Sequence, residues 1–124
     1  MRLREWAPSR HARRDRPSLT LCISEMASNE RHVVLDTFPV IIGRSPEADV
    51  YLTDPWISRV HCGLNFVDGH FVLRDLESQN GTWVNRGRVT ESVLGVDDQI
   101  NVGVTKIVVL DVEVGERRKR SDFG

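Results

Sequence analysis

Three short polar clusters contain the residue types that could bind a charged ligand. They are Gly43-Arg44-Ser45-Pro46, Ser58-Arg59-Val60-His61, and Ser78-Gln79-Asn80-Gly81-Thr82 with Asn85 shortly after it. Each cluster lies between stretches that have the character of β-strands, and binding residues usually lie on loops held by such a rigid scaffold. The clusters offer permanent cations, hydroxyl groups and side-chain amides.

A phosphate group is the ligand that suits these side chains. Phosphate carries between one and two negative charges and three acceptor oxygens, so it needs a fixed cation and neutral donors. Arg44 supplies a planar guanidinium, which matches phosphate better than a lysine would. Ser58 offers a hydroxyl and a backbone N–H, and Arg59 a second positive charge. Asn80 has both a donor and an acceptor, and can therefore hold the backbone of an extended peptide.

The same residues also have purely structural interpretations. Arg44 could be a surface salt-bridge partner, and Ser58 a turn residue. Asn80 and Gly81 both tolerate positive φ and could form a tight turn, which is the function expected of Gly81, whereas Asn80 is expected to serve both turn and ligand. His61 is expected to hydrogen-bond loop backbone and fix Ser58 rather than to touch the ligand.

The clusters, taken in order, resemble the core of a forkhead-associated (FHA) domain. That family shows Gly-Arg after an early strand, then Ser-x-x-His, then Asn-Gly-Thr followed by Val-Asn. Here the chain reads GRSPEADVYLTDPWISRVHCGL and then LRDLESQNGTWVN. The resemblance covers roughly residues 18–114. It implies an all-β, eleven-stranded β-sandwich of antiparallel type, whose loops at one end bind a phosphothreonine peptide.

The resemblance and the chemistry together give a set of candidate site residues. The expected phosphopeptide contacts are Arg44, Ser58, Arg59, Gln79 and Asn80, and the expected supporting residues are Gly43, His61, Gly81, Thr82 and Asn85. The family often has a small hydroxyl residue at the position of Gln79, so a contact from this side chain to phosphate is left open. Trp56 either packs onto the sandwich or stands beside the peptide as a specificity contact. Trp83 is expected to be buried, and Cys62 to fill the core.

The pattern of hydrophobic residues predicts strands throughout the middle of the chain. Leu19, Leu21 and Ile23 alternate with polar or small residues, which is the period of a strand. Asp68-Gly69 between two apolar runs predicts a tight hairpin. No stretch of ten residues has helical spacing. The expected strands are 19–23, 33–38, 40–42, 50–52, 60–67, 70–76, 82–84, 88–90, 99–102 and 105–114.

Composition indicates one globular domain with charged ends. The chain has 124 residues, 40% hydrophobic and 28% charged. Residues 1–17 hold six arginines against two acidic residues and are expected to form a flexible basic arm; residues 115–124 are expected to form a flexible basic tail. The net charge is −1, so the sandwich between them carries an acidic excess. We expect no signal peptide and no membrane-spanning segment.

Other function classes are weaker. Ser58 and His61 with Asp54 or Asp75 suggest a serine hydrolase, but no G-x-S-x-G elbow is present, and the chain is expected not to be an enzyme. Nucleic-acid binding by the basic ends is a second alternative, although the arm contains no recognisable motif. An FHA fold that binds unphosphorylated partners is a third.

The expected partners are phosphothreonine-containing proteins, substrates of a Ser/Thr kinase, and the expected role is that of a signalling adaptor or pathway effector. We expect no cofactor and no metal, because two cysteines are too few for a zinc site and the histidines are not at ligand spacing to them. The low cysteine content predicts a reducing, cytoplasmic location, with the nucleus left open for a eukaryotic source. The oligomeric state is left open.

The junction between arm and sandwich raises a regulatory hypothesis. Ser18 and Thr20 follow a run of arginines of the kind that attracts kinases. Phosphorylated Thr20 could occupy the site of a neighbouring molecule, or of its own chain if the first strand frays. The simpler interpretation is that Thr20 is an ordinary strand residue.

Overall fold

The computed structural model describes residues 16–26 and 29–115, and within them eleven β-strands form two sheets. The five-stranded sheet has the order β10-β7-β6-β4-β5. Its strands are β4 (Val40–Gly43), β5 (Val50–Tyr51), β6 (Cys62–Val67), β7 (His70–Asp75) and β10 (Glu91–Leu94).

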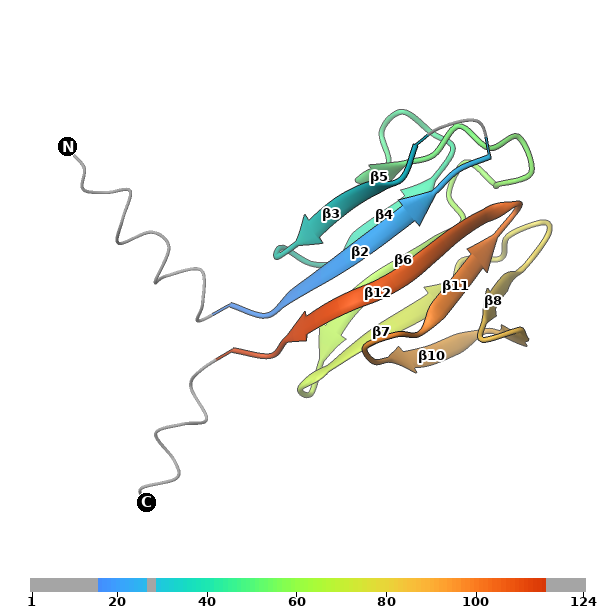
Figure 1. The fold of residues 1–124 in the computed structure, drawn as a ribbon. Coiled ribbons are helices and arrows are strands. Elements are labelled where there is room, and N and C mark those ends of the chain that lie inside the picture. Colours follow the sequence, from blue (N-terminus) through green and yellow to red (C-terminus); the bar gives the residue numbers. More distant parts are fainter. Residues whose placement is uncertain (1–15, 27–28, 116–124) are drawn as a thin grey trace, which may run out of the picture.

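The second sheet has six strands in the order β3-β2-β12-β11-β8-β9 and lies face to face with the first (Figure 1). Its strands are β2 (Ser18–Ser24), β3 (Arg31–Leu35), β8 (Thr82–Val84), β9 (Gly87–Val89), β11 (Gln99–Val102) and β12 (Thr105–Glu113). Only β4 and β5 pair in parallel among the described strands. The predicted all-β sandwich is confirmed.

Side-chain alternation builds the core between the two sheets. Leu19, Leu21 and Ile23 on β2 are all fully buried, as their period-two spacing predicts. Phe71 is the largest fully buried side chain, and its ring centroid lies 4.8 Å from that of Phe66. Such apolar burial is the main favourable contribution to folding, and it gives the loops at the ends of the strands a rigid base.

The predicted hairpin at Asp68-Gly69 is confirmed. These two residues have φ values of 51° and 83°, and Val67 pairs directly with His70. Two consecutive residues with positive φ form a turn whose twist matches that of the flanking strands, which explains the preference for Asp-Gly. The hairpin fixes the register between β6 and β7, and thereby places Asp75 opposite Cys62.

Several strand boundaries differ from the prediction. The strand expected at 60–67 begins only at Cys62, because Val60 belongs to the preceding loop and is 49% exposed. β9 covers 87–89 instead of 88–90. β10 was not predicted: Val93 and Leu94 are adjacent apolar residues on opposite faces, one exposed and one buried, so the segment lacks the alternation that marks a half-buried strand.

The expectation that Trp83 is buried is wrong. Trp83 is the middle residue of β8, and its side chain is 38% exposed. Thr82 is fully buried on the same short strand, so the alternation of side chains turns Trp83 to the outer face of the sheet. Arg88 on β9 and Asn101 on β11 pair with it across the sheet.

Both cysteines are free and buried. Cys62 has the position in the core that was predicted for it, at 0% exposure. Burial, together with the nearby Asp75 carboxylate, raises the pKa of the Cys62 thiol to about 12. The thiol is therefore neutral and acts as a small apolar side chain.

The hypothesis about Thr20 meets an obstacle in the position of β2. Thr20 pairs with Val34 of β3 on one side and with Asp111 of β12 on the other. For Thr20 to reach the binding site of its own chain, β2 would have to leave the sheet. Because β2 is an inner strand, this would break its pairing with both neighbours, whereas an edge strand would lose only one.

Most of the predicted arm and tail lies outside the described residues. In the described part of the chain, no helical segment has the length and hydrophobicity needed to span a bilayer.

Candidate functional site

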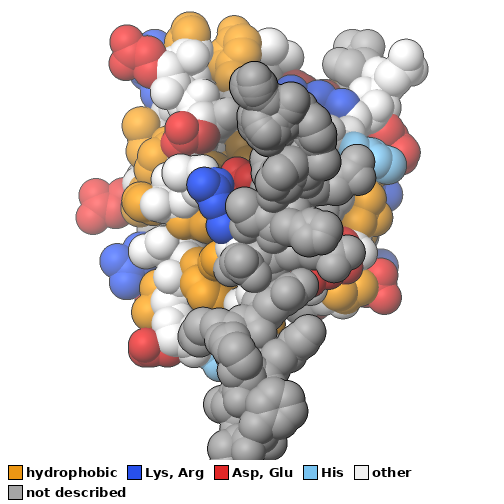
Figure 2. All heavy atoms as spheres, turned by 90° about the vertical axis from the view of Figure 1, so that its left-hand side faces the viewer, with side chains coloured by type: hydrophobic (Ala, Val, Ile, Leu, Met, Phe, Trp, Pro, Cys, Tyr) orange, Lys and Arg blue, Asp and Glu red, His pale blue; other side chains and the backbone are white. Residues whose placement is uncertain are grey.

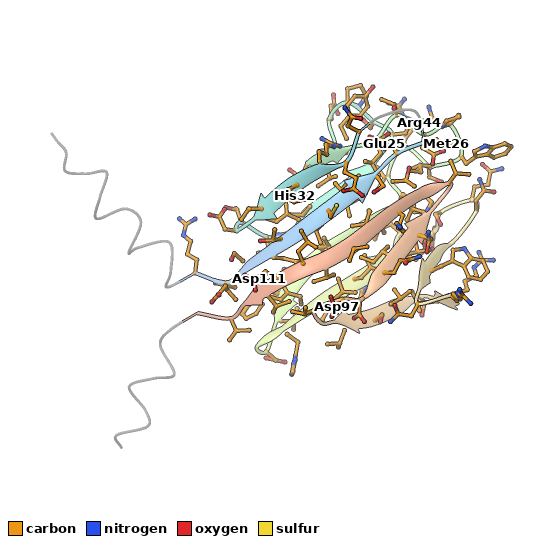
Figure 3. All side chains as sticks on the ribbon, in the orientation of Figure 1. Glu25, Met26, His32, Arg44, Asp97 and Asp111 are labelled. Carbon is orange, nitrogen blue, oxygen red and sulfur yellow. The ribbon has the colours of Figure 1, made fainter. Side chains whose placement is uncertain are left out.

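Three loops meet at one end of the sandwich. The first connects β4 to β5, the second connects β5 to β6, and the third connects β7 to β8. Figure 3 shows Arg44 at this end, near Glu25 and Met26, whereas Asp97 and Asp111 lie toward the opposite end. The three clusters found in the sequence are therefore brought together by the strand connections.

Gly43 allows the first two loops to approach each other closely. The N–H of Arg44 donates to the carbonyl of Ser58 at 3.0 Å, and the N–H of Ser45 donates to the carbonyl of Arg59 at 3.1 Å. A Cβ atom on Gly43 would lie 2.0 Å from the Arg59 carbonyl oxygen. The glycine is thus required by the contact between backbones.

The Arg44 side chain is held at its base and exposed at its tip. Its Nε donates to the carbonyl oxygen of Ile57 at 2.9 Å. This bond fixes the plane of the guanidinium and leaves the two terminal nitrogens for a ligand. Because Arg44 itself is exposed, those nitrogens face solvent at the end of the sandwich. Arg59 follows Ser58 in the second loop and is likewise exposed.

His61 links the second loop to the third from within the core. It is fully buried, its Nδ1 accepts the N–H of Ser58 at 3.0 Å, and its Nε2 lies 2.8 Å from the carbonyl oxygen of Gly81. A nitrogen that accepts an N–H carries no proton, so Nε2 carries it and donates to Gly81. His61 therefore has the position expected of a residue that holds loop backbone.

Ser58 is positioned from both sides. Its backbone N–H is held by His61, and its Oγ accepts the N–H of Gln79 at 3.0 Å. Because Oγ acts as acceptor in this bond, the hydroxyl proton can be donated to an anionic oxygen of a ligand. Gln79 thus contributes its backbone to the site, and its side chain is exposed.

Asn80 connects the third loop back to the second. Its Nδ2 donates to the carbonyl oxygen of Trp56 at 2.9 Å. No described residue bonds the second proton of the amide or the side-chain carbonyl, and Asn80 is exposed. Gly81 follows with φ 95°, a conformation that glycine adopts without strain.

Asp75 is a loop anchor that the sequence reasoning did not identify. Its carboxylate accepts the hydroxyls of Ser78 and Thr82, each at 2.6 Å, and the N–H of Ser78 at 3.2 Å. Partial burial acts to raise the pKa of Asp75, but these hydrogen bonds outweigh it and the pKa is lowered. Thr82 therefore braces the third loop, as expected. Asp side chains commonly bond nearby backbone N–H groups in turns, as Asp75 does with Ser78.

Asp54 is a second anchor that the sequence did not reveal, and it joins two distant parts of the chain. It is 5% exposed. One carboxylate oxygen accepts the N–H of Trp56 at 2.8 Å, and the other accepts the N–H of Val104 at 2.7 Å and the Thr105 hydroxyl at 2.9 Å. An Asp that bonds the N–H two residues later is a local turn signal, but the link to β12 depends on the tertiary fold.

Trp56 stands free of the sandwich. It is 61% exposed, so the interpretation that it packs back onto the core is wrong. It borders a shallow hollow of about 240 Å³ together with Asn80, Trp83 and Val104. Two tryptophans thus lie beside the amide that was predicted to hold a peptide.

Asn85 does not lie with the three loops. Its side chain bonds Asp98 and the N–H of Gln99, both at 2.9 Å, at the far end of β8. It supports the turn before β11, and does so with φ 49°. Of the expected supporting residues, Asn85 is the one that the fold places away from the clusters.

The sequence model of the FHA domain matches residues 40–103, which include all three loops. The chain belongs to the FHA domain family. The resemblance read from the motifs is thereby confirmed.

Known FHA proteins resemble the chain in sequence and in fold. It is 38% identical over 77 residues to an oxoglutarate dehydrogenase inhibitor of Corynebacterium efficiens, covering 62% of this chain and 54% of that protein. It is 36% identical over 77 residues to the glycogen accumulation regulator GarA of Mycolicibacterium smegmatis, covering 62% and 49%. The chain thus spans about half the length of these relatives.

A solved FHA domain, determined in a structural and functional analysis of phosphothreonine-dependent FHA domain interactions, superposes with a TM-score of 0.69 and 34% identity. The match covers 76% of this chain and 96% of that one.

Within the described residues, no group of three or more His, Cys, Asp or Glu side chains is arranged to hold a metal ion.

Proposed function

We propose that this FHA domain binds phosphothreonine-containing segments of partner proteins and acts as an adaptor or effector in a Ser/Thr kinase pathway. The observation that carries the proposal is the way Arg44, Ser58 and Asn80 are held. Among the described residues, each side chain makes one hydrogen bond to a neighbouring loop, which leaves its other polar groups for a ligand at the same end of the sandwich. Such fixed donors suit a dianionic ligand.

Each residue has a distinct role in the proposed complex. The terminal nitrogens of Arg44 and the Ser58 hydroxyl bind the phosphate oxygens, and Arg59 adds positive charge at the rim. Asn80 binds the ligand backbone with its free amide proton and carbonyl. Gln79, whose N–H holds Ser58, acts through that bond. The threonine methyl adds a small apolar contact, worth about 1 kcal/mol when buried.

The relatives support this function. One similar structure concerns phosphothreonine-dependent interactions, and two relatives are by name an inhibitor and a regulator. Figure 2 shows the end of the sandwich opposite the three loops, where acidic, basic and hydrophobic side chains are interspersed over the described surface that is visible. The described residues visible on this face form no clustered positive patch, which is the feature that a nucleic-acid backbone selects.

The position of His61 argues against a hydrolase. Both ring nitrogens are bonded to backbone atoms, one to the Ser58 N–H and the other to the Gly81 carbonyl. The ring therefore has no nitrogen left to take a proton from the Ser58 hydroxyl, which a catalytic triad requires. We propose that the chain is not an enzyme, and that it acts in the reducing cytoplasm, in keeping with its two free cysteines.

Binding of an oriented phosphopeptide library to the full chain tests the function. We expect phosphothreonine peptides to bind, matched phosphoserine peptides to bind more weakly, and unphosphorylated peptides not to bind. Calorimetry on the best sequence then gives the affinity of all three forms. Equal binding of the phosphorylated and unphosphorylated forms would favour the third alternative, a scaffold for unphosphorylated partners.

A further inference from the structure

Arg88 lies against the third loop although it stands outside the three sequence clusters. A Cβ atom on Gly81 would lie 2.9 Å from Nε and 3.0 Å from Cζ of Arg88. The guanidinium therefore packs directly over the α-carbon of Gly81, next to Asn80. Gly81 thus serves two purposes, since its φ of 95° forms the turn and its missing side chain makes room for the arginine.

The stem of Arg88 is positioned by the sheet. Arg88 pairs across β8 and β9 with Trp83, and directly opposed residues of an antiparallel pair project from the same face. Trp83 borders the hollow beside Asn80 and Trp56. Arg88 consequently stands on the outer face of the six-stranded sheet, at the side of the site on which Asn80 lies.

The charge of Arg88 has no partner in the described part of the chain. Arg31 and Arg74 form ion pairs there, with Glu25 and Glu91. Among the described residues no carboxylate pairs with Arg88 and no hydrogen bond from its guanidinium occurs. An arginine held over a binding loop, with none of its five donors bonded to a described residue, offers a fork for a carboxylate or a phosphate.

We propose that Arg88 recognises a second anionic group in the ligand, a carboxylate or a further phosphate that flanks the phosphothreonine. This inference rests on the proposed function and extends it from one phosphate to an acidic phosphopeptide. The ligand backbone held at Asn80 passes beside the Arg88 guanidinium, and an acidic side chain at that point forms the missing ion pair. Arg88 then acts as a specificity residue, separate from the phosphate contact of Arg44.

A glutamate scan of the ligand tests the proposal on the full chain. The probes are phosphothreonine peptides with alanine flanks, in which a single glutamate moves stepwise along both flanks. The wild type is expected to bind one of them about fivefold more tightly than the all-alanine peptide, the upper range for an exposed ion pair. In Arg88→Gln this gain disappears, while the affinity for the all-alanine peptide is kept. Arg86→Gln, which alters another exposed arginine on the same hairpin, is the matched control and retains the gain.

A further arm identifies the source of the second anion. In this arm, phosphoserine replaces glutamate at the position that gave the largest gain in affinity. If phosphoserine increases the affinity more than glutamate does, the site is assigned to a second phosphate. If it increases the affinity less, the site is assigned to a carboxylate. The proposal is overturned if no glutamate position improves binding, or if the gain survives in Arg88→Gln. Failure of the all-alanine phosphothreonine peptide to bind the wild type would instead refute the proposed function itself.

Discussion

The residues proposed to bind the ligand of this FHA domain also connect its loops. Arg44 bonds the Ile57 carbonyl, Asn80 bonds the Trp56 carbonyl, and Ser58 accepts the N–H of Gln79. Each side chain is therefore oriented before a ligand arrives, which lowers the entropy lost on binding. A substitution at any of them would remove both a proposed ligand contact and a hydrogen bond between loops, so folding and binding have to be measured on the same variant.

Replacing Arg44 by alanine is expected to weaken binding of a phosphothreonine peptide by about 1.5–3 kcal/mol, the value of a hydrogen bond to a charged group. Titration calorimetry measures this loss. Arg44→Lys is the control, because it keeps the charge but not the planar fork, and should give an intermediate affinity. If Arg44→Ala binds with unchanged affinity and unfolds at the same temperature, the proposed phosphate site is wrong.

Trp56 is expected to report on ligand binding through its fluorescence, because its exposed ring stands beside Asn80. Trp83 borders the same hollow and would contribute its own signal, so the measurement is made in a Trp83→Phe background. Trp56→Ala in the full chain should then change the preference for residues flanking the phosphothreonine. A variant that folds normally and keeps the wild-type preference would show that Trp56 makes no specific contact.

Among the elements, the contact between the first and second loops sets the shape of the site. Two backbone hydrogen bonds join them, at Arg44 and Ser45. The third loop is tied to the second by His61 and internally by Asp75. The strands fix only the points where these loops begin and end. The shape of the site therefore depends on hydrogen bonds between the loops, and losing a buried one costs more free energy than losing an exposed one.

Gly43→Ala is expected to separate the first two loops, because the added methyl would lie 2.0 Å from the Arg59 carbonyl. We expect a loss of about 1–3 kcal/mol in the free energy of unfolding, as for other overpacked sites, with weaker phosphopeptide binding. Urea denaturation measures the first effect. Gly95→Ala is the matched control, since a Cβ there meets no atom within 4 Å. Equal stability of the two variants would contradict the close approach.

At the scale of the whole molecule, stability is expected to fall in acid partly through Asp75. The pKa of this carboxyl is lowered in the folded chain, from an ordinary value of 3.8. The unfolded chain therefore takes up its proton first, and the stabilisation is present above about pH 4 and is lost as the pH falls below it. Denaturant unfolding over this range should show wild type and Asp75→Asn converging toward low pH. A constant difference between them would rule out this contribution.

The sequence by itself determined the fold class, the hairpin at Asp68-Gly69 and the three loop clusters. These features depend on short-range physics: alternation places side chains on one face or the other, and glycine, asparagine and aspartate are favoured where φ is positive. Alternation also turns Trp83 outward, although the size and hydrophobicity of this side chain favour burial. β10 could not be predicted from alternation, because its two apolar residues are adjacent.

Only the tertiary structure decided which residues surround the clusters. Asp54 meets Val104 and Thr105, fifty positions away or more, and Arg88 meets Gly81. Asn85, close to the third cluster in sequence, is carried to the far end of β8. These contacts depend on the order of strands within a sheet and on the register of β8 with β9 and β11. Strand order and register are set by the packing of the whole core, because all the strands have to bury their apolar faces in it simultaneously.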